Sequence, residues 1–341
     1  MFGHLEIKEE DFNKLTDRQR KYFRIMYAQS GVLFITAEPG VAKSAIMRTI
    51  ARKLGFQYFD VRLSMVDEID VGLFPYRKDV EIDYDDGSEE NVKKIISVMS
   101  YAIPEWAYKA NQKPSIVHFE ELNRAPLAVR NAALQLLLER AIGTEFKFNK
   151  NVLMVSSGNL GEADGTDVEE FDRALNNRLI HFDHTITLPE WVEDFAEGRI
   201  HPTFISFLKS NEEHFLHSFD EKRSKEASAY ATPRSWTFLS DYVVENYGME
   251  SSITDWADDI RDIGASYIGT GANARFIRYL DESLRFGVKD LLDRYDEVEE
   301  MLKELNRDRK SELLNGLKGM DLSGLVQHQK DNIKKFILTL S

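Results

Sequence analysis

The chain contains the stretch Val32-Leu33-Phe34-Ile35-Thr36-Ala37-Glu38-Pro39-Gly40-Val41-Ala42-Lys43-Ser44, in which an apolar run leads into a short loop. The loop follows most of the pattern G-x-x-x-x-G-K-[ST], whose backbone N–H groups surround phosphate while the lysine and hydroxyl bind phosphate and magnesium. Lys43 and Ser44 match this pattern, whereas Ala37 and Ala42 replace its two glycines. The stretch predicts a phosphate-binding loop between a buried strand and a helix. The alternative is an ordinary strand–turn–helix with Lys43 on the surface.

The loop residues themselves are the first candidates for holding a nucleotide. We expect Lys43 to bind phosphates as a point charge and Ser44 to be a magnesium ligand. The predicted phosphate-binding set is Glu38, Pro39, Gly40, Val41, Ala42, Lys43, Ser44 and Ala45. No N-K-x-D motif selects guanine, because Asn149-Lys150-Asn151-Val152 lacks the final aspartate. ATP is therefore the expected nucleotide, with Gln19 to Met26 as the candidate segment for adenine recognition.

Short apolar runs alternate with amphipathic stretches through the first half of the chain. Strands are predicted at residues 32–35, 56–63, 116–119, 152–155 and 179–182, and helices at residues 45–54 and 127–138. Near-continuous apolar strands separated by helices indicate a parallel sheet that is covered on both faces. The expected fold class is therefore α/β, with a parallel sheet flanked by helices.

Two segments interrupt this alternation and predict hairpins inserted into the sheet domain. The first covers about residues 71–104 and has an acidic tip from Glu81 to Glu90, whereas the second covers residues 141–150. Beyond Leu188-Pro189 the strand signal fades and the pattern becomes helical. The expected domains are an α/β domain at residues 1–188, a smaller all-α lid at 189–290 and a C-terminal helical extension at 291–341.

The composition is that of a globular protein, with 43% hydrophobic and 30% charged residues. The absence of cysteine rules out disulfides, thiolate metal sites and a cysteine nucleophile, and it fits a reducing cytoplasm. No secretory signal is visible, and the apolar runs are far shorter than the roughly 20 residues that span a bilayer. The net charge is −14 and basic residues are interspersed with acidic ones, which disfavours nucleic acid as the main partner. We expect a cytoplasmic protein without a membrane segment.

A second candidate element is the run Ile116-Val117-His118-Phe119-Glu120-Glu121, which ends in two acids. Phosphoryl transfer needs a carboxylate near magnesium and a group that orients water. A parallel strand delivers both at its carboxyl end, where open α/β sheets bind ligands. We expect Glu120 to hold the metal through water and Glu121 to polarise the attacking water. The alternative is a pair of surface acids, and His118 is expected to be a packed core histidine.

The string Glu120-Glu121-Leu122-Asn123-Arg124-Ala125-Pro126 resembles the D-E-[IL]-N-R-A-P signature of MoxR-type AAA+ ATPases. Further segments that resemble the family follow in its order, at residues 70–72, 133–140, 156–159, 174–179 and 231–235. The resemblance spans about residues 15 to 285 and implies an AAA+ P-loop NTPase fold. It identifies the hairpins as the helix-2 insert and pre-sensor hairpin of that clade. Glu120 and Asn177 replace two aspartates of the pattern, which indicates a divergent member.

The resemblance also implies roles for residues outside the two motifs. Asn159 is similar to sensor 1, which helps to place the water. Arg178 is similar to the arginine finger, which reaches a neighbouring subunit's nucleotide, and Arg173 is the competing candidate. Arg234 is similar to sensor 2, which reads the γ-phosphate from the lid. The predicted catalytic set is Glu121, Asn159, Arg178 and Arg234, and the predicted metal set is Ser44 and Glu120.

A finger supplied by a neighbouring subunit implies a ring, because head-to-tail interfaces close on themselves. The resemblance implies a hexamer that hydrolyses ATP with Mg²⁺ and remodels a protein client, often beside a von Willebrand A domain protein. One alternative is a nucleic-acid motor, since the clade includes the McrB type. Another is a regulatory nucleotide-binding module with little turnover, which the substitutions Ala42 and Glu120 favour.

Overall fold

The computed structural model divides the chain into two compact units. The first comprises Met1–Pro39 and Lys43–Thr185, and the second comprises Gly40–Ala42 and Ile186–Ser341. The residues that the structure describes are 5, 7–84, 92–144, 146–161, 168, 171, 173–210, 216–218, 229–285, 288–304, 310, 313–314, 317, 322 and 324–339. No helix among these residues is long and apolar enough to cross a membrane.

The first unit is built on a five-stranded parallel sheet in the order β2-β5-β8-β1-β9. Its strands are β1 (Val32–Thr36), β2 (Gln57–Arg62), β5 (Ser115–Glu120), β8 (Val152–Gly158) and β9 (Leu179–Asp183). Every residue of β5 and β8 is buried, which explains why these strands have almost no polar alternation in the sequence. All five predicted strands are present.

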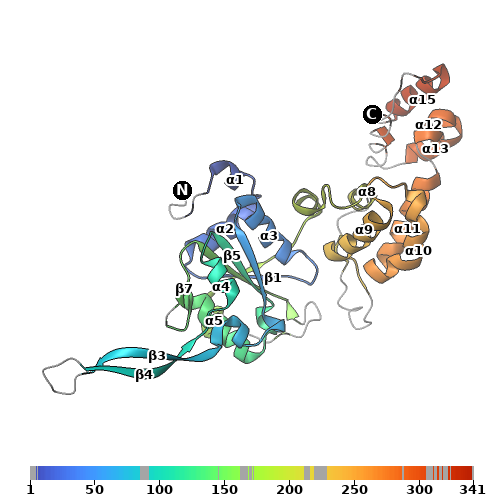
Figure 1. Ribbon diagram of the computed structural model, residues 1–341. Helices are drawn as coiled ribbons and strands as arrows, with labels where there is room; N and C mark the ends of the chain where they lie inside the picture. The colour runs from blue at the N-terminus through green and yellow to red at the C-terminus, as the bar shows by residue number, and fades with distance from the viewer. Residues whose placement is uncertain are drawn as a thin grey trace. The chain divides into compact units, whose positions relative to one another are not determined.

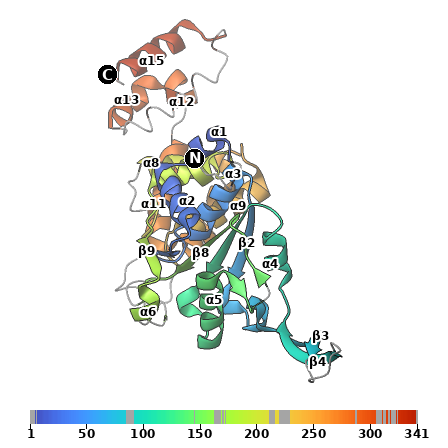
Figure 2. The same ribbon diagram turned by 90° about the vertical axis from the view of Figure 1, so that its left-hand side faces the viewer.

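Helices cover both faces of this sheet, as Figures 1 and 2 show. Alternate side chains of β1 point to opposite faces, so Leu33 and Ile35 belong to one core and Val32 and Phe34 to another. The first core includes side chains of α1 (Glu9–Asn13), α2 (Asp17–Ala28) and α3 (Lys43–Leu54), and the second includes those of α4 (Glu105–Ala110) and α5 (Leu127–Glu139). The predicted α/β fold with a covered parallel sheet is therefore confirmed.

Two hairpins are inserted into the first unit. The longer one pairs β3 (Pro75–Tyr84) with β4 (Val92–Tyr101) in antiparallel register and projects from the sheet, as Figure 1 shows. Most of its predicted acidic tip, from residue 85 to residue 90, lies outside the described residues. The shorter hairpin pairs β6 (Ala141–Ile142) with β7 (Phe146–Lys147). Both lie within the segments in which the sequence predicted them.

The described part of the second unit is helical. Its elements are α7 (Leu188–Trp191), the π-helix η5 (Val192–Ala196), α8 (Pro202–Ser210), α9 (Pro233–Tyr247), α10 (Ile253–Ile268), α11 (Thr270–Arg285), α12 (Val288–Asp293), α13 (Tyr295–Glu304) and α15 (Gln327–Leu338). One core contains Trp191, Phe204, Trp236 and Phe276. A separate core, around Phe336, joins α12, α13 and α15. The expected lid and extension boundaries at residues 188 and 290 stay predictions.

Candidate nucleotide-binding site

The phosphate loop, Ala37 to Ser44, connects β1 to α3 as the sequence predicts. The ammonium group of Lys43 lies at its centre, because Nζ donates to the carbonyl oxygens of Ala37 (2.6 Å) and Glu38 (3.3 Å). It also donates to Oδ1 of Asn159 (3.0 Å), which follows β8. Lys43 therefore joins the loop to a second strand end. An ammonium group held by neutral oxygens in this way can exchange them for phosphate oxygens.

The two alanines that replace glycines in the loop differ in backbone conformation. Gly40 has φ +83° and Ala42 has φ +68°, both in the left-handed region. For a residue with a Cβ this region costs about 1–2 kcal/mol, so Ala42 adopts a conformation that glycine would adopt more easily. Ala37 is buried and is not among the described residues with positive φ. Only the second substitution therefore strains the loop.

The first turn of α3 follows the loop directly. Lys43, Ser44 and Ala45 are all partly exposed, and the turn contains no acidic residue. The first N–H groups of a helix have no partner within the helix, and together with the helix dipole they favour an anion. The predicted phosphate-binding residues thus form a continuous loop and helix start. Ser44, the second residue of α3, stays the predicted magnesium ligand.

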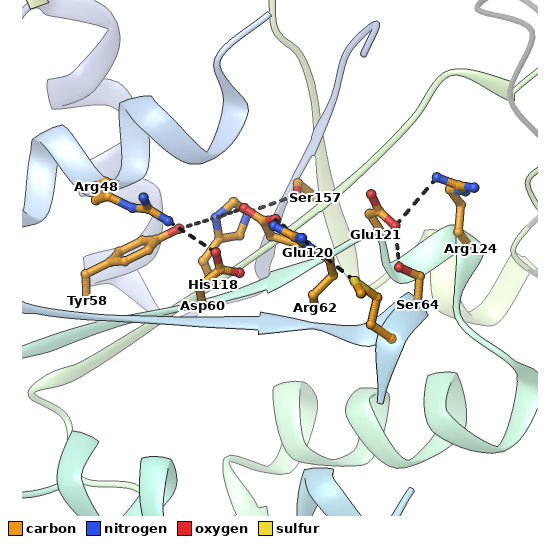
Figure 3. Close-up of polar contacts among 11 residues, drawn as sticks. Arg48, Tyr58, Asp60, Arg62, Ser64, His118, Glu120, Glu121, Arg124 and Ser157 are labelled. Carbon is orange, nitrogen blue, oxygen red and sulfur yellow. Dashed lines mark hydrogen bonds and ion pairs between the residues drawn. The ribbon is translucent and has the colours of Figure 1, made fainter. Parts of the chain in front are cut away.

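Glu120 is the last residue of β5 and is almost fully buried, with 5% of its surface exposed. On β2, Arg62 pairs with it in register, and its Nε and Nη2 both lie 3.4 Å from Oε2 of Glu120. The other carboxylate oxygen, Oε1, is 3.6 Å from Nδ1 of His118 and has no hydrogen-bond partner. Figure 3 shows these side chains together. A buried carboxylate oxygen without a partner is unusual and suits a metal or a metal-bound water.

The histidine beside Glu120 is a core residue, as the sequence analysis expected. His118 is fully buried, and its ring lies between the hydroxyls of Tyr58 and Ser157, both at 2.9 Å. Burial lowers the pKa of His118 to about 4, against the opposing effect of the Glu120 charge. The imidazole is therefore neutral at pH 7. It connects β2, β5 and β8 beneath the site and brings no positive charge to Glu120.

Glu121 follows β5 in a left-handed conformation, with φ +59°. Its carboxylate accepts a hydrogen bond from the hydroxyl of Ser64 and lies 3.6 Å from Nη1 of Arg124, as Figure 3 shows. Ser64 belongs to the short 3₁₀ helix η1 (Leu63–Met65) after β2. A left-handed glutamate is an energetic cost that often marks a functional position. The turn places Glu121 beside Glu120 but in a different set of contacts.

Asn159 is held by a residue to which the sequence analysis gave no role. Its N–H donates to Oδ1 of Asn123 (3.2 Å), and Nδ2 of Asn123 donates back to the carbonyl of Asn159 (2.8 Å). Gly158 permits this approach, because a Cβ at that position would lie 2.4 Å from the same Oδ1. The strand end of β8 is thereby fixed to η3 (Leu122–Arg124). Asn123 thus positions the predicted sensor residue.

Arg178 lies at the opposite edge of the sheet from the phosphate loop. It directly precedes β9, and its carbonyl accepts a hydrogen bond from Val32 at the start of β1 (3.3 Å). The length of β1, at roughly 3.3 Å per residue, separates it from the loop by roughly 16 Å, which exceeds the reach of one side chain. Arg178 and Arg173 are both exposed, and no described residue forms an ion pair with Arg178. Arg178 therefore does not reach the loop of its own chain.

Two further predicted sites are Arg234 and the segment Gln19 to Met26. Arg234 belongs to the second unit, where it is exposed at the start of α9. Its predicted role stays a prediction. The expected adenine-binding segment Gln19 to Met26 forms part of α2, and its Gln19, Tyr22, Phe23 and Met26 side chains are buried in the core. Gln19 accepts hydrogen bonds from Thr16 and Lys53. These four side chains therefore belong to the core, and the role of the segment in adenine recognition stays a prediction.

A magnesium site at the loop would depend on few protein ligands. In the part of the chain that the structure describes, no three His, Asp or Glu side chains gather into a metal-binding group. Magnesium at nucleotide sites is held by one or two protein oxygens together with water and phosphate oxygens, so such a group is not required. Ser44 and Glu120, whose Oε1 has no hydrogen-bond partner, stay the predicted oxygen ligands.

No protein-family model matches the chain, and no curated protein matches it. Among solved structures the chain is similar to a "putative ATPase" from Cytophaga hutchinsonii, with 11% identity and a TM-score of 0.34, over 97% of this chain and 78% of that one. It is also similar to the RuvB Holliday junction branch migration motor of Thermotoga maritima, with 12% identity and a TM-score of 0.35, over 85% and 78%. Similarities this low concern the fold alone. The function has to be argued from the site.

Proposed function

We propose that this chain is an AAA+ ATPase that binds ATP with Mg²⁺ at the phosphate loop and hydrolyses it. The observation that supports the proposal is the contact between Lys43 and Asn159 (3.0 Å), at the carboxyl edge where β5 ends in Glu120 and Glu121 follows it. A phosphate-binding lysine, a buried acid, a second acid and a polar sensor on adjacent parallel strands are the parts that phosphoryl transfer needs.

Each residue has a separate task in this proposal. Lys43 and the N–H groups of the loop bind the β and γ phosphates, and Asn159 couples the position of Lys43 to the reacting phosphate. Glu121 accepts a proton from the attacking water, and its contacts with Ser64 and Arg124 set its direction. Ser44 and Glu120 are the residues that would hold a Mg²⁺ ion, which would supply positive charge to the phosphates.

The proposal extends to a ring of MoxR-like subunits. The location of Arg178 supports it, because an arginine at the amino edge of the sheet cannot reach its own loop and is exposed at the surface. Supply of this arginine in trans requires an oligomer, for which we propose a hexamer. The expected work is the remodelling of a protein client, with a von Willebrand A domain protein as a candidate partner. The net charge of −14 disfavours the alternative of a nucleic-acid motor.

A second candidate function is a nucleotide-binding module with little turnover. The strained Ala42 and the contacts that hold both carboxylates favour it: Glu120 is paired with Arg62 and Glu121 with Ser64. In that case ATP would bind tightly while phosphate release by the assembled protein stayed near the uncatalysed rate. Nucleotide affinity and turnover measured on the same sample separate the two candidates.

The decisive measurement is ATP turnover as a function of protein concentration. We expect specific activity to rise with concentration as subunits assemble, and Glu121→Gln to abolish turnover while leaving nucleotide binding intact. Lys43→Ala serves as the binding control and should lose both. Activity that is independent of concentration and survives Glu121→Gln would contradict the mechanism and the assignment of residues together.

A further inference from the structure

The surroundings of Glu120 contain a feature that the proposed function does not use. Arg62 is the one lysine or arginine among the described residues that forms an ion pair with Glu120. Its side chain is half exposed, at 49%, whereas that of Glu120 is only 6% exposed. The pair therefore joins a buried anion to a cation with a short route into solvent.

The other charged groups nearby have different partners. Arg48 pairs with Asp60 (3.2 Å) and lies over the ring of Tyr58, 5.1 Å from its centre. The Lys43 ammonium is held by the loop and Asn159. The ring nitrogens Nδ1 and Nε2 of His118 lie 2.9 Å from the hydroxyls of Tyr58 and Ser157. Arg62 thus provides the counter-charge that a buried carboxylate needs.

We propose that Arg62 is a counter-ion that takes the place of the metal, pairing with Glu120 when no divalent cation is bound and leaving it when the metal–nucleotide complex binds. This inference rests on the proposed function, because it assigns Glu120 to the metal. A guanidinium and a divalent cation at one carboxylate repel each other, and the low polarity of the site strengthens that repulsion. The cross-strand pairing of Arg62 with Glu120 makes the exchange a movement of one side chain.

The exchange has two measurable consequences. Arg62 competes with the metal, so removal of its charge strengthens metal binding. Arg62 also stabilises the metal-free protein, so the same substitution lowers the melting temperature without metal and leaves it nearly unchanged with metal and nucleotide. A residue with a purely structural role would lower the melting temperature under both conditions and would not tighten metal binding.

The test uses Mn²⁺ as a paramagnetic probe, with its binding to the full chain followed by electron paramagnetic resonance in the presence of a non-hydrolysable ATP analogue. Arg62→Gln should bind Mn²⁺ about three- to tenfold more tightly than the wild type. Arg62→Lys, which keeps the charge, should bind like the wild type. Arg48→Gln is the matched control, because it removes one positive charge from a neighbouring ion pair that does not include Glu120, and it should change Mn²⁺ affinity less than about twofold.

Three outcomes would overturn the inference. Equal or weaker Mn²⁺ binding by Arg62→Gln would show that Arg62 helps to hold the metal or has no effect on it. An equal gain in Mn²⁺ affinity in Arg48→Gln would show that the effect comes from net charge near the site and not from the pairing of Arg62 with Glu120. If the wild type shows no nucleotide-dependent Mn²⁺ binding, or if Ser44→Ala leaves that binding unchanged, the proposed function fails first and the inference with it. A wild type that binds while Arg62→Gln shows no gain contradicts the inference alone.

Discussion

At the scale of single residues, the site contains two residues in the left-handed backbone conformation, which is unfavourable for them, Ala42 and Glu121. The cost at Glu121 coincides with a proposed catalytic role, whereas Ala42 has only a methyl group, which performs no chemistry. Strain at Ala42 is therefore a property of the loop that a substitution can remove. Burial of His118 is a second unfavourable feature at this scale. Because burial lowers the pKa of His118, it makes the stability of the fold depend on pH.

The first prediction is that Ala42→Gly stabilises the protein. Relief of the left-handed conformation gains about 1–2 kcal/mol, and the greater freedom of glycine in the unfolded chain offsets roughly 0.5–1 kcal/mol of it. A net gain of about 0.5–1 kcal/mol is expected in denaturant unfolding. Ala37→Gly is the matched control, because Ala37 is buried and does not have a positive φ. This substitution should destabilise the protein. A loss of stability in both variants would show that the backbone of Ala42 is not strained.

The second prediction concerns acid stability. Burial lowers the pKa of His118 to about 4 in the folded protein, below the roughly 6.5 of an unfolded chain. The unfolded state therefore binds more protons between those values, so the free energy of unfolding falls as the pH decreases from 6.5 to 4. The contribution of His118 is of the order of 3 kcal/mol. His118→Gln should flatten this part of the pH profile, as measured by denaturant unfolding at a series of pH values between 4 and 7.

At the scale of elements, the strands and helices were predictable because their signals are local. Apolar runs such as Val152–Val155 and the helical spacing in α5 lie within one segment of the chain. The contacts that organise the site depend on strand register. Arg62 meets Glu120, and Ser64 meets Glu121, only because β2 pairs with β5 across more than fifty residues. Sequence periodicity contains no information about that pairing.

The third prediction tests one of these contacts between elements. Asn123→Ala removes both hydrogen bonds to the backbone of Asn159 and leaves buried groups without partners. We expect a loss of about 1–3 kcal/mol in stability and a lower kcat, because Asn159 loses its support. Asn176→Ala removes an exposed hydrogen bond to a backbone carbonyl in the same unit and should cost less than about 0.5 kcal/mol. Unchanged turnover in Asn123→Ala would show that the position of Asn159 does not affect the reaction.

At the scale of the whole molecule, the separation between the phosphate loop and Arg178 limits how the proposed active site can be assembled. The sequence suggested a finger in trans through resemblance alone, whereas the fold shows that Arg178 cannot reach the loop of its own chain. Parallel pairing of Val32 with Leu179 puts Arg178 at the amino edge of the sheet and the loop at the carboxyl edge. A single chain therefore holds two halves of a proposed site that it cannot join by itself.

The last prediction follows from this division. Glu121→Gln and Arg178→Ala should each lose turnover, the second by about 10³–10⁵ if Arg178 stabilises the transition state. When the two variants are mixed in equal amounts, about a quarter of the interfaces in a ring pair an intact Glu121 with an intact Arg178. Activity should therefore reappear in the mixture at a level of roughly a quarter of that of the wild type. Arg173→Ala, which alters an exposed arginine five residues earlier, should retain activity by itself. If the mixture stays inactive while both variants still assemble and bind nucleotide, Arg178 is not supplied by a neighbouring subunit. If Arg178→Ala keeps full turnover by itself, Arg178 has no part in the reaction. Either result removes the structural support for the ring mechanism.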